Sequence, residues 1–349
     1  MKKLFSFIAI ILISILSISC STKPKLYIVN WGDYMDPALI SAFEAEYGVD
    51  VEEEPVDSNE AMATRIQTGS YDIAVFSEYM VDKLIDQNLL QPINFALLTN
   101  NSELTVIPKL SSLYCSSSIV PYVIPYAWGT IGIMYDNDKP ELKALIETEG
   151  WAALFEHTDE YNVGMYDSSR DAVAAALLYK GYNVNSDNLG ELAEAEAALI
   201  AADFSWGTDE LRGWVIEETL DMALVYSGDY FSEYYLADED SITFDFYVPT
   251  TTNVWLDSMV IPQNAQNVVL AHQFIDFFLR EDIAIANSDY IGYAPCYEEI
   301  YNALVIDYGY DMVNFDPYPD DTIRQMYVYG TDERSQRLTA ILLAAKNND

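Results

Sequence analysis

The sequence predicts an α/β fold built from two units, and three observations lead to this prediction. Short apolar runs alternate with helical patterns over residues 26–85, in the β-α-β-α-β order of a doubly wound layer. The same alternation begins again at Trp151. Between the two units, residues 124–136 form a long extended segment, typical of a hinge strand that links two compact bodies. An edge strand would produce the same pattern.

The first predicted strand ends in an unusual group of side chains. Leu26 to Val29 is an apolar run with two β-branched residues, as in the buried strands of parallel sheets. It is followed by two aromatic rings and a carboxylate in the run NWGDY at 30–34, where a glycine lets the backbone turn. Open α/β sheets bind ligands at this edge, although a strand that simply ends in a loop fits these nine residues equally well.

Helix signals follow in order along the first unit. Asp36 and Pro37 are an N-cap and a first-turn proline, and Gly48 suits the position after the last helical turn. Ser58 or Asn59 caps the next helix.

A further strand in this unit brings more polar side chains to the same edge. The strand at 73–75 is followed at once by Ser77 and Tyr79. Because parallel strands share their carboxyl edge, we expect these two residues beside Trp31 and Tyr34.

The second unit repeats the arrangement of aromatic ring, glycine and carboxylate. A strand at 161–166 precedes a helix that begins at Ser168, where Ser168-x-x-Asp171 is a capping box. Asp171 can serve both as a capping residue and as a cleft residue, because a helix N-terminus can line a cleft. A strand at 220–226 ends in Tyr226, Ser227, Gly228 and Asp229.

Two later segments add candidates. Strands are expected at 242–248 and 253–261, and in the second of these Trp255 and Asp257 project to the same face. The run IGYAP at 291–295 is a turn that carries Tyr293.

The C-terminal part is predicted to be helical. Residues 268–280 form an amphipathic helix in which His272 is expected to serve packing or to lie on the helix surface. Residues 321–346 are expected to form two helices with a polar break near Gly330.

The N-terminus has the layout of an export signal. Lys2 and Lys3 precede an uncharged, mainly apolar stretch at 4–18, which is too short to span a bilayer comfortably. The small residue before Cys20 resembles the lipobox of bacterial lipoproteins, so residues 1–19 are expected to be removed and residues 20–25 to form a lipidated tether. Cys115 and Cys296 would then lie in an oxidising compartment, where their pairing stays open.

Composition narrows the class of ligand. The chain has 349 residues, of which 51% are hydrophobic, and a formal net charge of -39. Such a surface repels nucleic acid and attracts cations, although an acidic surface can also serve solubility alone.

The candidate residues share a chemistry that suits an organic cation. Aromatic faces attract ammonium groups, and carboxylates accept their charge-assisted hydrogen bonds. The set contains no basic residue, no cluster of metal-binding spacing and no catalytic motif, so neither a cofactor nor a metal nor an enzyme activity is expected, and no signature points to a carboxylate pair for glycoside hydrolysis. The candidates are Trp31, Asp33, Tyr34, Ser77, Tyr79, Asp171, Tyr226, Asp229, Trp255, Asp257 and Tyr293.

Several separate motifs lie along the chain. They are NWGDY at 30–34, SNEAM at 58–62, YDIAVFSEYMVDKL at 71–84, IPYAWGTIGI at 124–133, WLDSMVIP at 255–262 and IGYAP at 291–295. Together they resemble the motifs of one family, the extracytoplasmic spermidine- and putrescine-binding receptors of polyamine ABC importers. The similarity runs from Leu26 to about Gly330.

The resemblance implies a role for each candidate. The rings of Trp31, Tyr34, Tyr226, Trp255 and Tyr293 would wall the methylene chain of the ligand. The carboxylates of Asp33, Asp171, Asp229 and Asp257 would bind its amines, and Ser77 and Tyr79 would add hydrogen bonds.

The sequence departs from the family pattern at several positions. Tyr226 replaces a tryptophan, Asp171 a glutamate, and Gly32 a threonine or serine. Ser168 stands at a position that is acidic in the spermidine type, and the run at 226–229 is closer to the putrescine type. A glutamine of the spermidine type has no clear counterpart, although Tyr329 lies nearby. These departures leave the length of the polyamine open.

The family's fold implies two lobes joined by crossing hinge strands, each lobe a central sheet flanked by helices. We expect lobe 1 to comprise 26–132 plus 257–300, and lobe 2 to comprise 133–256 plus 301–349. The resemblance implies a monomeric receptor on the periplasmic or cell-surface side, anchored to the membrane through Cys20, that delivers its ligand to permease subunits and their ATPase. The alternatives are a receptor of the same fold for thiamine or an amino acid, and an acid-base hydrolase.

Overall fold

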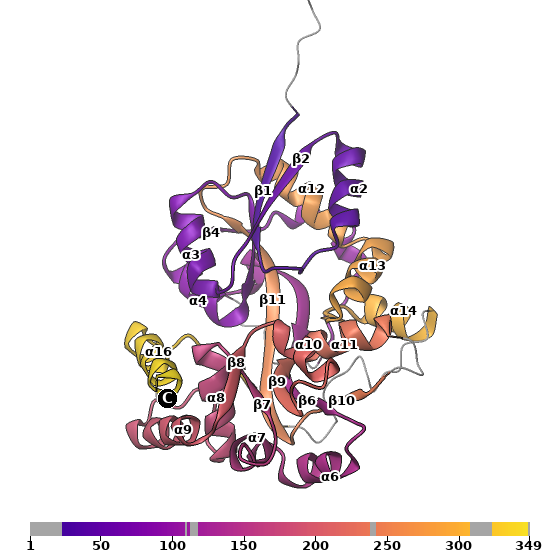
Figure 1. Cartoon of the computed structure of the whole chain (residues 1–349). Helices are drawn as coiled ribbons and strands as arrows, with labels where there is room; N and C mark the ends of the chain where they lie inside the picture. Colours follow the sequence, from indigo (N-terminus) through magenta and orange to yellow (C-terminus); the bar gives the residue numbers. More distant parts are fainter. Residues whose placement is uncertain (1–22, 109, 112–117, 238–241, 308–322, 348–349) are drawn as a thin grey trace, which may run out of the picture.

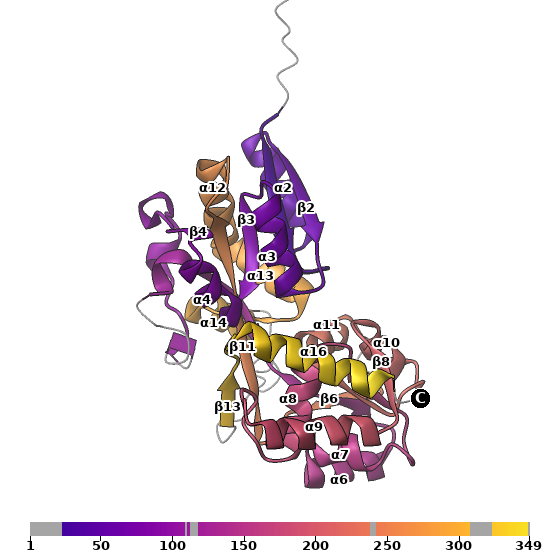
Figure 2. The same ribbon diagram turned by 90° about the vertical axis from the view of Figure 1, so that its left-hand side faces the viewer.

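The protein consists of two α/β lobes, one above the other in Figure 1. The computed structural model describes residues 23–108, 110–111, 118–237, 242–307 and 323–347. Strand β11 (Thr251–Pro262) runs through the waist between the lobes in both ribbon views (Figures 1 and 2). The predicted two-lobed α/β class is confirmed.

One sheet forms the centre of the upper lobe. Its strands are β1 (Lys25–Asn30), β2 (Asp50–Pro55), β3 (Ile73–Ser77), β5 (Ile124–Gly129), β11 and β12 (Ala294–Pro295), with β4 (Leu90–Gln91) and β13 (Ile323–Met326) also paired to β11. The strand order is β12-β5-β11-β3-β1-β2. β1 is parallel to β2 and β3, whereas β11 is antiparallel to β3 and β5.

The second sheet forms the centre of the lower lobe. Its strands are β6 (Ile131–Asp136), β7 (Val163–Tyr166), β8 (Phe204–Gly207), β9 (Met222–Tyr226) and β10 (Phe244–Tyr247). Their order is β10-β6-β9-β7-β8, with β7 parallel to both neighbours and β6 antiparallel to both of its own. The carboxyl ends of β7 and β9 therefore point the same way.

Helices cover both sheets. The upper lobe carries α2 (Pro37–Tyr47), α3 (Asn59–Thr68), α4 (Glu78–Asp86), α12 (Val268–Phe278), α13 (Glu281–Ile291), α14 (Glu298–Asp307) and the short turns η1 (Phe95–Leu97), η2 (Asn101–Glu103) and η3 (Val120–Tyr122). The lower lobe carries α6 (Pro140–Glu149), α7 (Ala152–Glu156), α8 (Ser169–Tyr179), α9 (Leu189–Ala201), α10 (Glu210–Ile216), α11 (Ser227–Leu236) and α16 (Asp332–Lys346). None of the described helices has the length and apolar character needed to cross a bilayer.

The predicted caps are confirmed where local chemistry decides them. Asp36 accepts a hydrogen bond from the backbone N–H of Ala38 at 2.8 Å, and Gly48 ends α2 in the left-handed conformation at φ 66°. Ser58 accepts from the backbone N–H of Ala61 and begins α3. Side-chain caps satisfy N–H groups that the first helical turn leaves without partners.

The core of the upper lobe lies between its sheet and helices α2 and α12. The Phe43 ring of α2 meets the rings of Phe274 and Phe277 of α12, with centroids 4.9 and 5.5 Å apart. All three side chains are buried. His272 on the same helix accepts a hydrogen bond from the backbone N–H of Asn94, which confirms its predicted packing role.

The extended segment at 124–136 joins the two sheets. It forms β5 in the first sheet and β6 in the second, separated by Thr130. β5 lies between β12 and β11, and β6 lies between β10 and β9, so the edge-strand interpretation is wrong. The chain crosses from one lobe to the other at this point.

Buried polar groups tie the two crossing strands together. Thr130 Oγ1 lies 2.9 Å from the carbonyl oxygen of Asn253 and 3.0 Å from Thr252 Oγ1. Asn253 Oδ1 accepts from the backbone N–H of Ile131 at 2.8 Å. The side chains of Thr130, Thr252 and Asn253 have no exposed surface. This hydrogen-bonded group fixes the register of β5–β6 against β11.

The C-terminal segment corrects one prediction. Residues 323–326 form strand β13 instead of the first of two helices, because they pair in parallel with Thr251–Val254 of β11. Such a partner is distant in the sequence and leaves no local signal. The second helix is confirmed as α16, after Gly330 in the left-handed conformation. The residue boundaries of the two lobes stay predictions.

Three sequence predictions fall on residues that the structure does not describe. The signal segment at 1–19, the lipidation site Cys20 and the cysteine Cys115 lie outside the described residues. Cys296 is a free, buried cysteine.

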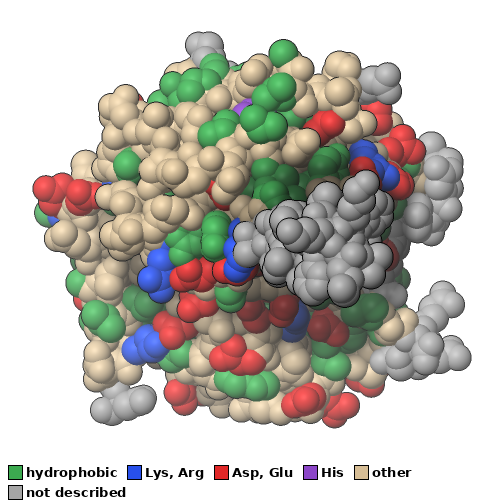
Figure 3. All heavy atoms as spheres, turned by 90° about the horizontal axis from the view of Figure 1, so that it is seen from above, with side chains coloured by type: hydrophobic (Ala, Val, Ile, Leu, Met, Phe, Trp, Pro, Cys, Tyr) green, Lys and Arg blue, Asp and Glu red, His purple; other side chains and the backbone are tan. Residues whose placement is uncertain are grey.

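Asp and Glu side chains are unevenly distributed over the face seen from above (Figure 3). They gather in the lower half of that view and at its edges, several of them beside Lys or Arg side chains, whereas the upper left part shows mainly hydrophobic and uncharged surface.

Candidate functional site

The side chains predicted at the strand ends of the upper lobe meet around Asp257. This residue is paired with Ser77 in the register of β11 and β3. Tyr34, which follows β1, donates its hydroxyl to Asp257 Oδ2 at 2.9 Å. Burial raises the pKa of Asp257 to about 6, while interactions with the Ser77 and Tyr34 hydroxyls favour its charged form. Three strands thus contribute to one buried carboxylate.

Asn59 fixes the neighbouring hydroxyl groups. Its Nδ2 donates to Ser77 Oγ at 3.0 Å and to the Tyr79 hydroxyl at 2.8 Å. Its Oδ1 accepts from the backbone N–H of Ser77 at 3.1 Å. All three residues are buried. The Asn59 amide therefore connects the start of α3 to the carboxyl end of β3.

Asp171 occupies the corresponding place in the lower lobe. It lies in the first turn of α8, where Ser168 donates to its Oδ2 at 2.6 Å and accepts from its backbone N–H. The Tyr226 hydroxyl donates to Oδ2 at 2.8 Å, and the Tyr327 hydroxyl donates to Oδ1 at 2.9 Å. Asp171 thus takes part in the predicted cap and also faces the rings at the centre of the molecule.

Asp229 is paired with a cation that the sequence analysis did not include. Arg212 of α10 donates to Asp229 Oδ1 at 3.0 Å, and the backbone N–H of Tyr226 donates to Oδ2 at 3.3 Å. Burial raises the pKa of Asp229 to about 6, and the positive charge of Arg212 acts in the opposite direction. Arg212 thus places a basic residue beside a set of candidates that contains none.

Four rings form a continuous wall from one lobe to the other. Centroids are 6.2 Å apart for Tyr226 and Trp255, 5.0 Å for Trp255 and Tyr293, and 5.4 Å for Tyr293 and Tyr34, in edge-to-face arrangements. Tyr34, Trp255 and Tyr293 are each less than a tenth exposed. The structure thus brings together four of the five rings predicted to enclose a ligand.

Two glycines allow this close packing. A Cβ at Gly129 would lie 2.6 Å from the Trp255 ring, and a Cβ at Gly228 would overlap the Tyr293 ring. Gly129 ends β5 and Gly228 lies in the first turn of α11. Any side chain at these positions would push a ring away from the lobe contact.

The remaining two candidates are placed differently. Trp31 is partly buried, and its indole N–H has no hydrogen-bond partner among the described residues. Asp33 is exposed and has a positive φ of 50°. The structure therefore does not bury Asp33 with the other carboxylates, and its role in binding stays a prediction.

Sequence reasoning missed several residues of this cluster. Tyr327 donates to Asp171, whereas Tyr329, two residues later, interacts with Lys83 and Asp332 at the edge. The Arg170 guanidinium lies 3.8 Å from the Tyr79 ring centroid and so bridges the lobes. Of these missed residues, Arg170 is the one that the sequence could have indicated, because it lies directly before Asp171 in the predicted capping box.

Glu78 was missed as well. It is the first residue of α4, directly after Ser77, and is only 4% exposed. Burial raises its pKa to about 8. A carboxylate with such a strongly perturbed pKa beside Asp257 marks a functional candidate.

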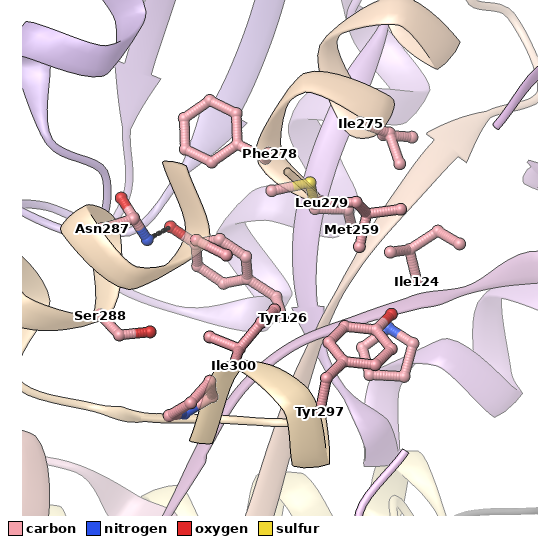
Figure 4. Close-up of a pocket in the computed structure, with 13 residues that line it drawn as sticks. Ile124, Tyr126, Met259, Ile275, Phe278, Leu279, Asn287, Ser288, Tyr297 and Ile300 are labelled. Atoms are coloured by element: carbon pink, nitrogen blue, oxygen red, sulfur yellow. Dashed lines mark hydrogen bonds between the residues drawn. The ribbon is translucent and has the colours of Figure 1, made fainter. Parts of the chain in front are cut away.

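A separate cavity lies deeper in the upper lobe. It is lined by mostly apolar side chains between β5, α12 and α13, among them Met259, Phe278 and Ile300 (Figure 4). Asn287 donates to the Tyr126 hydroxyl there, and Tyr126 in turn donates to the carbonyl of Tyr34 at 2.5 Å. The Tyr126 side chain, which lines this cavity, thus holds the backbone of Tyr34 in place. The cavity itself is not lined by Asp171 or Asp257. In the described part of the chain no group of three or more His, Cys, Asp or Glu residues is arranged to bind a metal.

Comparison with known proteins gives a consistent result. Residues 38–308 match the model of the bacterial extracellular solute-binding proteins. The spermidine/putrescine-binding periplasmic protein of Escherichia coli K12 is 29% identical over 275 residues, which are 77% of this chain and 76% of that protein. The putrescine-binding periplasmic protein SpuD of Pseudomonas aeruginosa is 26% identical over 87% of this chain and 86% of its own.

A solved structure extends the agreement to the fold. The spermidine/putrescine ABC transporter substrate-binding protein PotD of Streptococcus pneumoniae superimposes with a TM-score of 0.71 at 29% identity. The match covers 93% of this chain and 99% of that one.

Proposed function

This chain belongs to the bacterial extracellular solute-binding protein family, and we propose that it captures a polyamine, putrescine or spermidine, between its two lobes. The bound ligand is then delivered to the permease subunits of an ABC-type importer and their ATPase. No catalytic step and no cofactor is assigned to the chain. The named relatives that bind spermidine and putrescine support this choice of ligand.

The observation that carries the proposal is the opposition of buried carboxylates across a wall of rings. Asp257 comes from the upper lobe and Asp171 from the lower, and each is 5% exposed. Tyr226, Trp255 and Tyr293 lie between them. Two acidic ends separated by an apolar, aromatic middle match a chain of methylene groups with an ammonium at each end.

Magnitudes indicate which contacts decide binding. Four buried methylene groups contribute about 3 kcal/mol, and a ring face adds about 0.5 to 2 kcal/mol per ammonium. Burying an unpaired ammonium costs several kcal/mol. The carboxylates therefore determine whether the ligand binds, and the rings determine which length fits.

The burial of these residues implies movement. Tyr34, Asp171, Trp255 and Asp257 are all less than a tenth exposed, so a ligand reaches them only when the lobes separate. The crossing strands β5–β6 and β11 are where such a hinge motion would occur. We propose that lobe 1 comprises roughly 26–132 plus 257–300, that lobe 2 comprises roughly 133–256 plus 301–349, and that a monomer closes on its ligand.

The cellular setting follows from the N-terminal sequence. We propose that residues 1–19 are removed on export and that Cys20 carries a lipid, so that residues 20–25 tether the receptor to a membrane. Mass spectrometry of the purified mature protein would measure this directly, as a mass that begins at Cys20 with an acyl modification.

Titration calorimetry with a ligand panel tests the function. Putrescine, spermidine and spermine are compared with lysine and thiamine, the last two standing for receptors of the same fold with another ligand. We expect at least one polyamine to bind with a Kd well below 100 µM and the others to bind more weakly. If no polyamine binds below about 100 µM, an affinity of about 5.5 kcal/mol, the proposal is wrong.

A further inference from the structure

Glu78 occupies a position between the two lobes that the proposed function does not yet use. It follows Ser77, which is paired with Asp257 across β3 and β11, so it begins α4 beside the predicted ammonium site. From the lower lobe, Arg170 and Tyr327 interact electrostatically with Glu78. The Glu78 carboxyl therefore lies where the lobes meet.

Only one of the two carboxyl oxygens of Glu78 has a hydrogen-bond partner among the described residues. Glu78 Oε2 accepts a hydrogen bond from the backbone N–H of Leu256 at 2.9 Å, which holds β11 against the start of α4. Glu78 Oε1 is buried and has no hydrogen-bond partner among the described residues. A purely structural role accounts for the first oxygen and leaves the second unexplained, because buried polar atoms are almost always hydrogen-bonded.

Asp257 presents the same feature. Its Oδ2 accepts from Tyr34, while its Oδ1 is buried without a partner in the described part of the chain. Among all described residues, Glu78 Oε1 and Asp257 Oδ1 are the buried carboxylate oxygens in this condition. The indole N–H of Trp255, two residues before Asp257, is also buried and unpaired there.

The carboxylates of the lower lobe differ. Both oxygens of Asp171 accept hydroxyl hydrogen bonds, and both oxygens of Asp229 are occupied by Arg212 and the Tyr226 N–H. Among the described residues, the buried carboxylate oxygens that can still accept a hydrogen bond from a cation therefore lie on the upper lobe.

The charges around Glu78 fit a group that ionises when a cation arrives. Burial raises its pKa to about 8, the backbone N–H of Leu256 opposes this rise, the negative charge of Asp257 adds to it, and Arg170 acts against it. Tyr327 is the other titratable group facing it. Two adjacent carboxyls in a buried site cannot both carry a charge cheaply without a cation between them.

We propose that Glu78 is a ligand-binding residue, and that Glu78 Oε1 and Asp257 Oδ1 together accept hydrogen bonds from one ammonium group of the bound polyamine. This inference rests on the proposed function and adds a residue to it. An ammonium has three N–H donors, so it can fill both unpaired oxygens at once. Glu78 loses its proton to solvent when the ammonium takes that place.

Calorimetry of the purified protein with putrescine at pH 7 tests this inference. Glu78→Gln keeps the size of the side chain and an acceptor for Leu256 but removes the charge. We expect its Kd to rise at least about tenfold, as for the loss of a hydrogen bond to a charged group. The matched control is Glu52→Gln, which removes the same charge from an exposed residue of β2 and leaves the Kd unchanged.

Proton release separates a binding role from a structural one. Titrations in phosphate and in Tris, whose ionisation enthalpies differ, count the protons released per ligand. We expect release of about one proton from the unmodified protein and loss of most of it in Glu78→Gln. This count needs no variant, so the absence of release at pH 7 overturns the inference even where Glu78→Gln does not fold.

The outcomes distinguish this inference from the proposed function. If the unmodified protein binds putrescine and Glu78→Gln binds it equally well with the same proton count, Glu78 is not a ligand and the function stands. If the unmodified protein binds neither putrescine nor spermidine, the proposed function fails and this inference falls with it.

Discussion

Asp171 and Asp257 are buried to the same extent, yet their surroundings prepare them for different tasks. Asp171 accepts hydrogen bonds from the hydroxyls of Ser168, Tyr226 and Tyr327, so both of its oxygens have hydrogen-bond partners before any ligand arrives. Asp257 accepts a hydrogen bond from Tyr34 and interacts with the Ser77 hydroxyl, while its Oδ1 has no hydrogen-bond partner in the described part of the chain. Removal of the charge at Asp257 should therefore affect binding more than folding.

We predict that Asp257→Asn weakens putrescine binding by at least about 2 kcal/mol, because a buried ammonium would lose its charged partner. Asparagine keeps an acceptor for the Tyr34 hydroxyl, so the unfolding midpoint should stay close to that of the unmodified protein. Titration calorimetry and thermal melts of both proteins measure these two effects. An unchanged affinity would place the ammonium site elsewhere.

Individual candidate residues could be predicted from the sequence where they lie at the end of a strand or the start of a helix. Asp171 and Asp257 could be predicted because a capping box and a strand alternation mark them locally. Arg212 could not, because it reaches Asp229 from another helix and no local pattern links the two. Asp33 was grouped with the others by its strand-end position, but the local turn leaves it exposed.

At the scale of elements, helices α13 and α11 meet where the two lobes touch, and this contact includes Tyr293, one of the four rings of the wall. Gly292 ends α13 at φ 73°, and a Cβ there would lie 2.5 Å from the Gly228 carbonyl of α11. Tyr293, the next residue, lies flat against Gly228 and edge-to-face with Trp255. The Tyr293 ring, which we propose encloses the ligand, is thus also the ring on which the lobes meet.

We predict that Gly228→Ala lowers putrescine affinity at least about tenfold, because the added methyl group overlaps the Tyr293 ring and holds the lobes apart. Alanine favours the helix, so stability should not fall for a local reason. Calorimetry gives the affinity, and small-angle scattering gives the ligand-induced decrease in radius of gyration, which should disappear.

The matched control is Gly213→Ala in α10, where a Cβ meets nothing within 4 Å. This variant should bind and close like the unmodified protein. Equal affinity in both variants would show that Tyr293 moves aside without cost.

The crossing strands form a second element with a specific chemical requirement. Thr130 Oγ1 is fully buried and forms hydrogen bonds with Thr252 Oγ1 and with the carbonyl oxygen of Asn253. Replacement by valine keeps the shape but leaves these groups with one partner fewer.

We predict that Thr130→Val lowers the free energy of unfolding by about 1 to 3 kcal/mol, the cost of an unsatisfied buried polar group. Urea unfolding followed by fluorescence measures it. Thr339→Val, on the exposed face of α16, is the control and should change stability by less than about 0.5 kcal/mol. A similar small effect in both variants would contradict the role of the hinge hydrogen bonds.

Elements were predictable where their own residues specify them. The capped helices α2, α3 and α8 and the long strand β11 correspond to clear local patterns. Strand β13 was mistaken for a helix because Ile323–Met326 becomes a strand only through its partner β11, more than 70 residues earlier.

At the scale of the whole molecule, buried carboxyls and a large negative charge act in the same direction on stability. The pKa of Glu78 is raised to about 8, and those of Asp229 and Asp257 to about 6. Each value lies above the value of the unfolded chain, so the folded state binds more protons over these ranges. The free energy of unfolding is therefore highest near pH 5 and declines as the pH rises through the pKa values that the three carboxyls have in the folded state.

We predict that the melting temperature of the free protein falls between about pH 5 and pH 8 and levels off above about pH 8, where all three carboxyls are ionised in the folded state. Scanning fluorimetry from pH 5 to pH 9 measures this decline, and Glu78→Gln should remove most of it between about pH 6 and pH 8, where Glu78 is the one of the three carboxyls that still binds a proton in the folded state. A saturating polyamine should reduce the decline, because the cation pairs with the ionised carboxylates. A flat profile for the free protein would contradict the assigned pKa shifts.

The two-lobed architecture could be predicted because both units repeat a β-α rhythm and one extended segment joins them. The side of the cluster that we propose binds the ammonium could not be predicted, because it depends on which oxygens remain unpaired after folding. Those pairings involve Tyr327, Arg212 and Glu78, which come from three distant parts of the chain.

The indole N–H of Trp255, which has no hydrogen-bond partner in the described part of the chain, has an optical consequence. The emission of an indole depends on the charges and dipoles near its ring, and Trp255 is one of the six tryptophans in the chain. A cation bound beside its ring would shift the wavelength and change the intensity of that emission. Intrinsic fluorescence should therefore report the bound state without any attached dye.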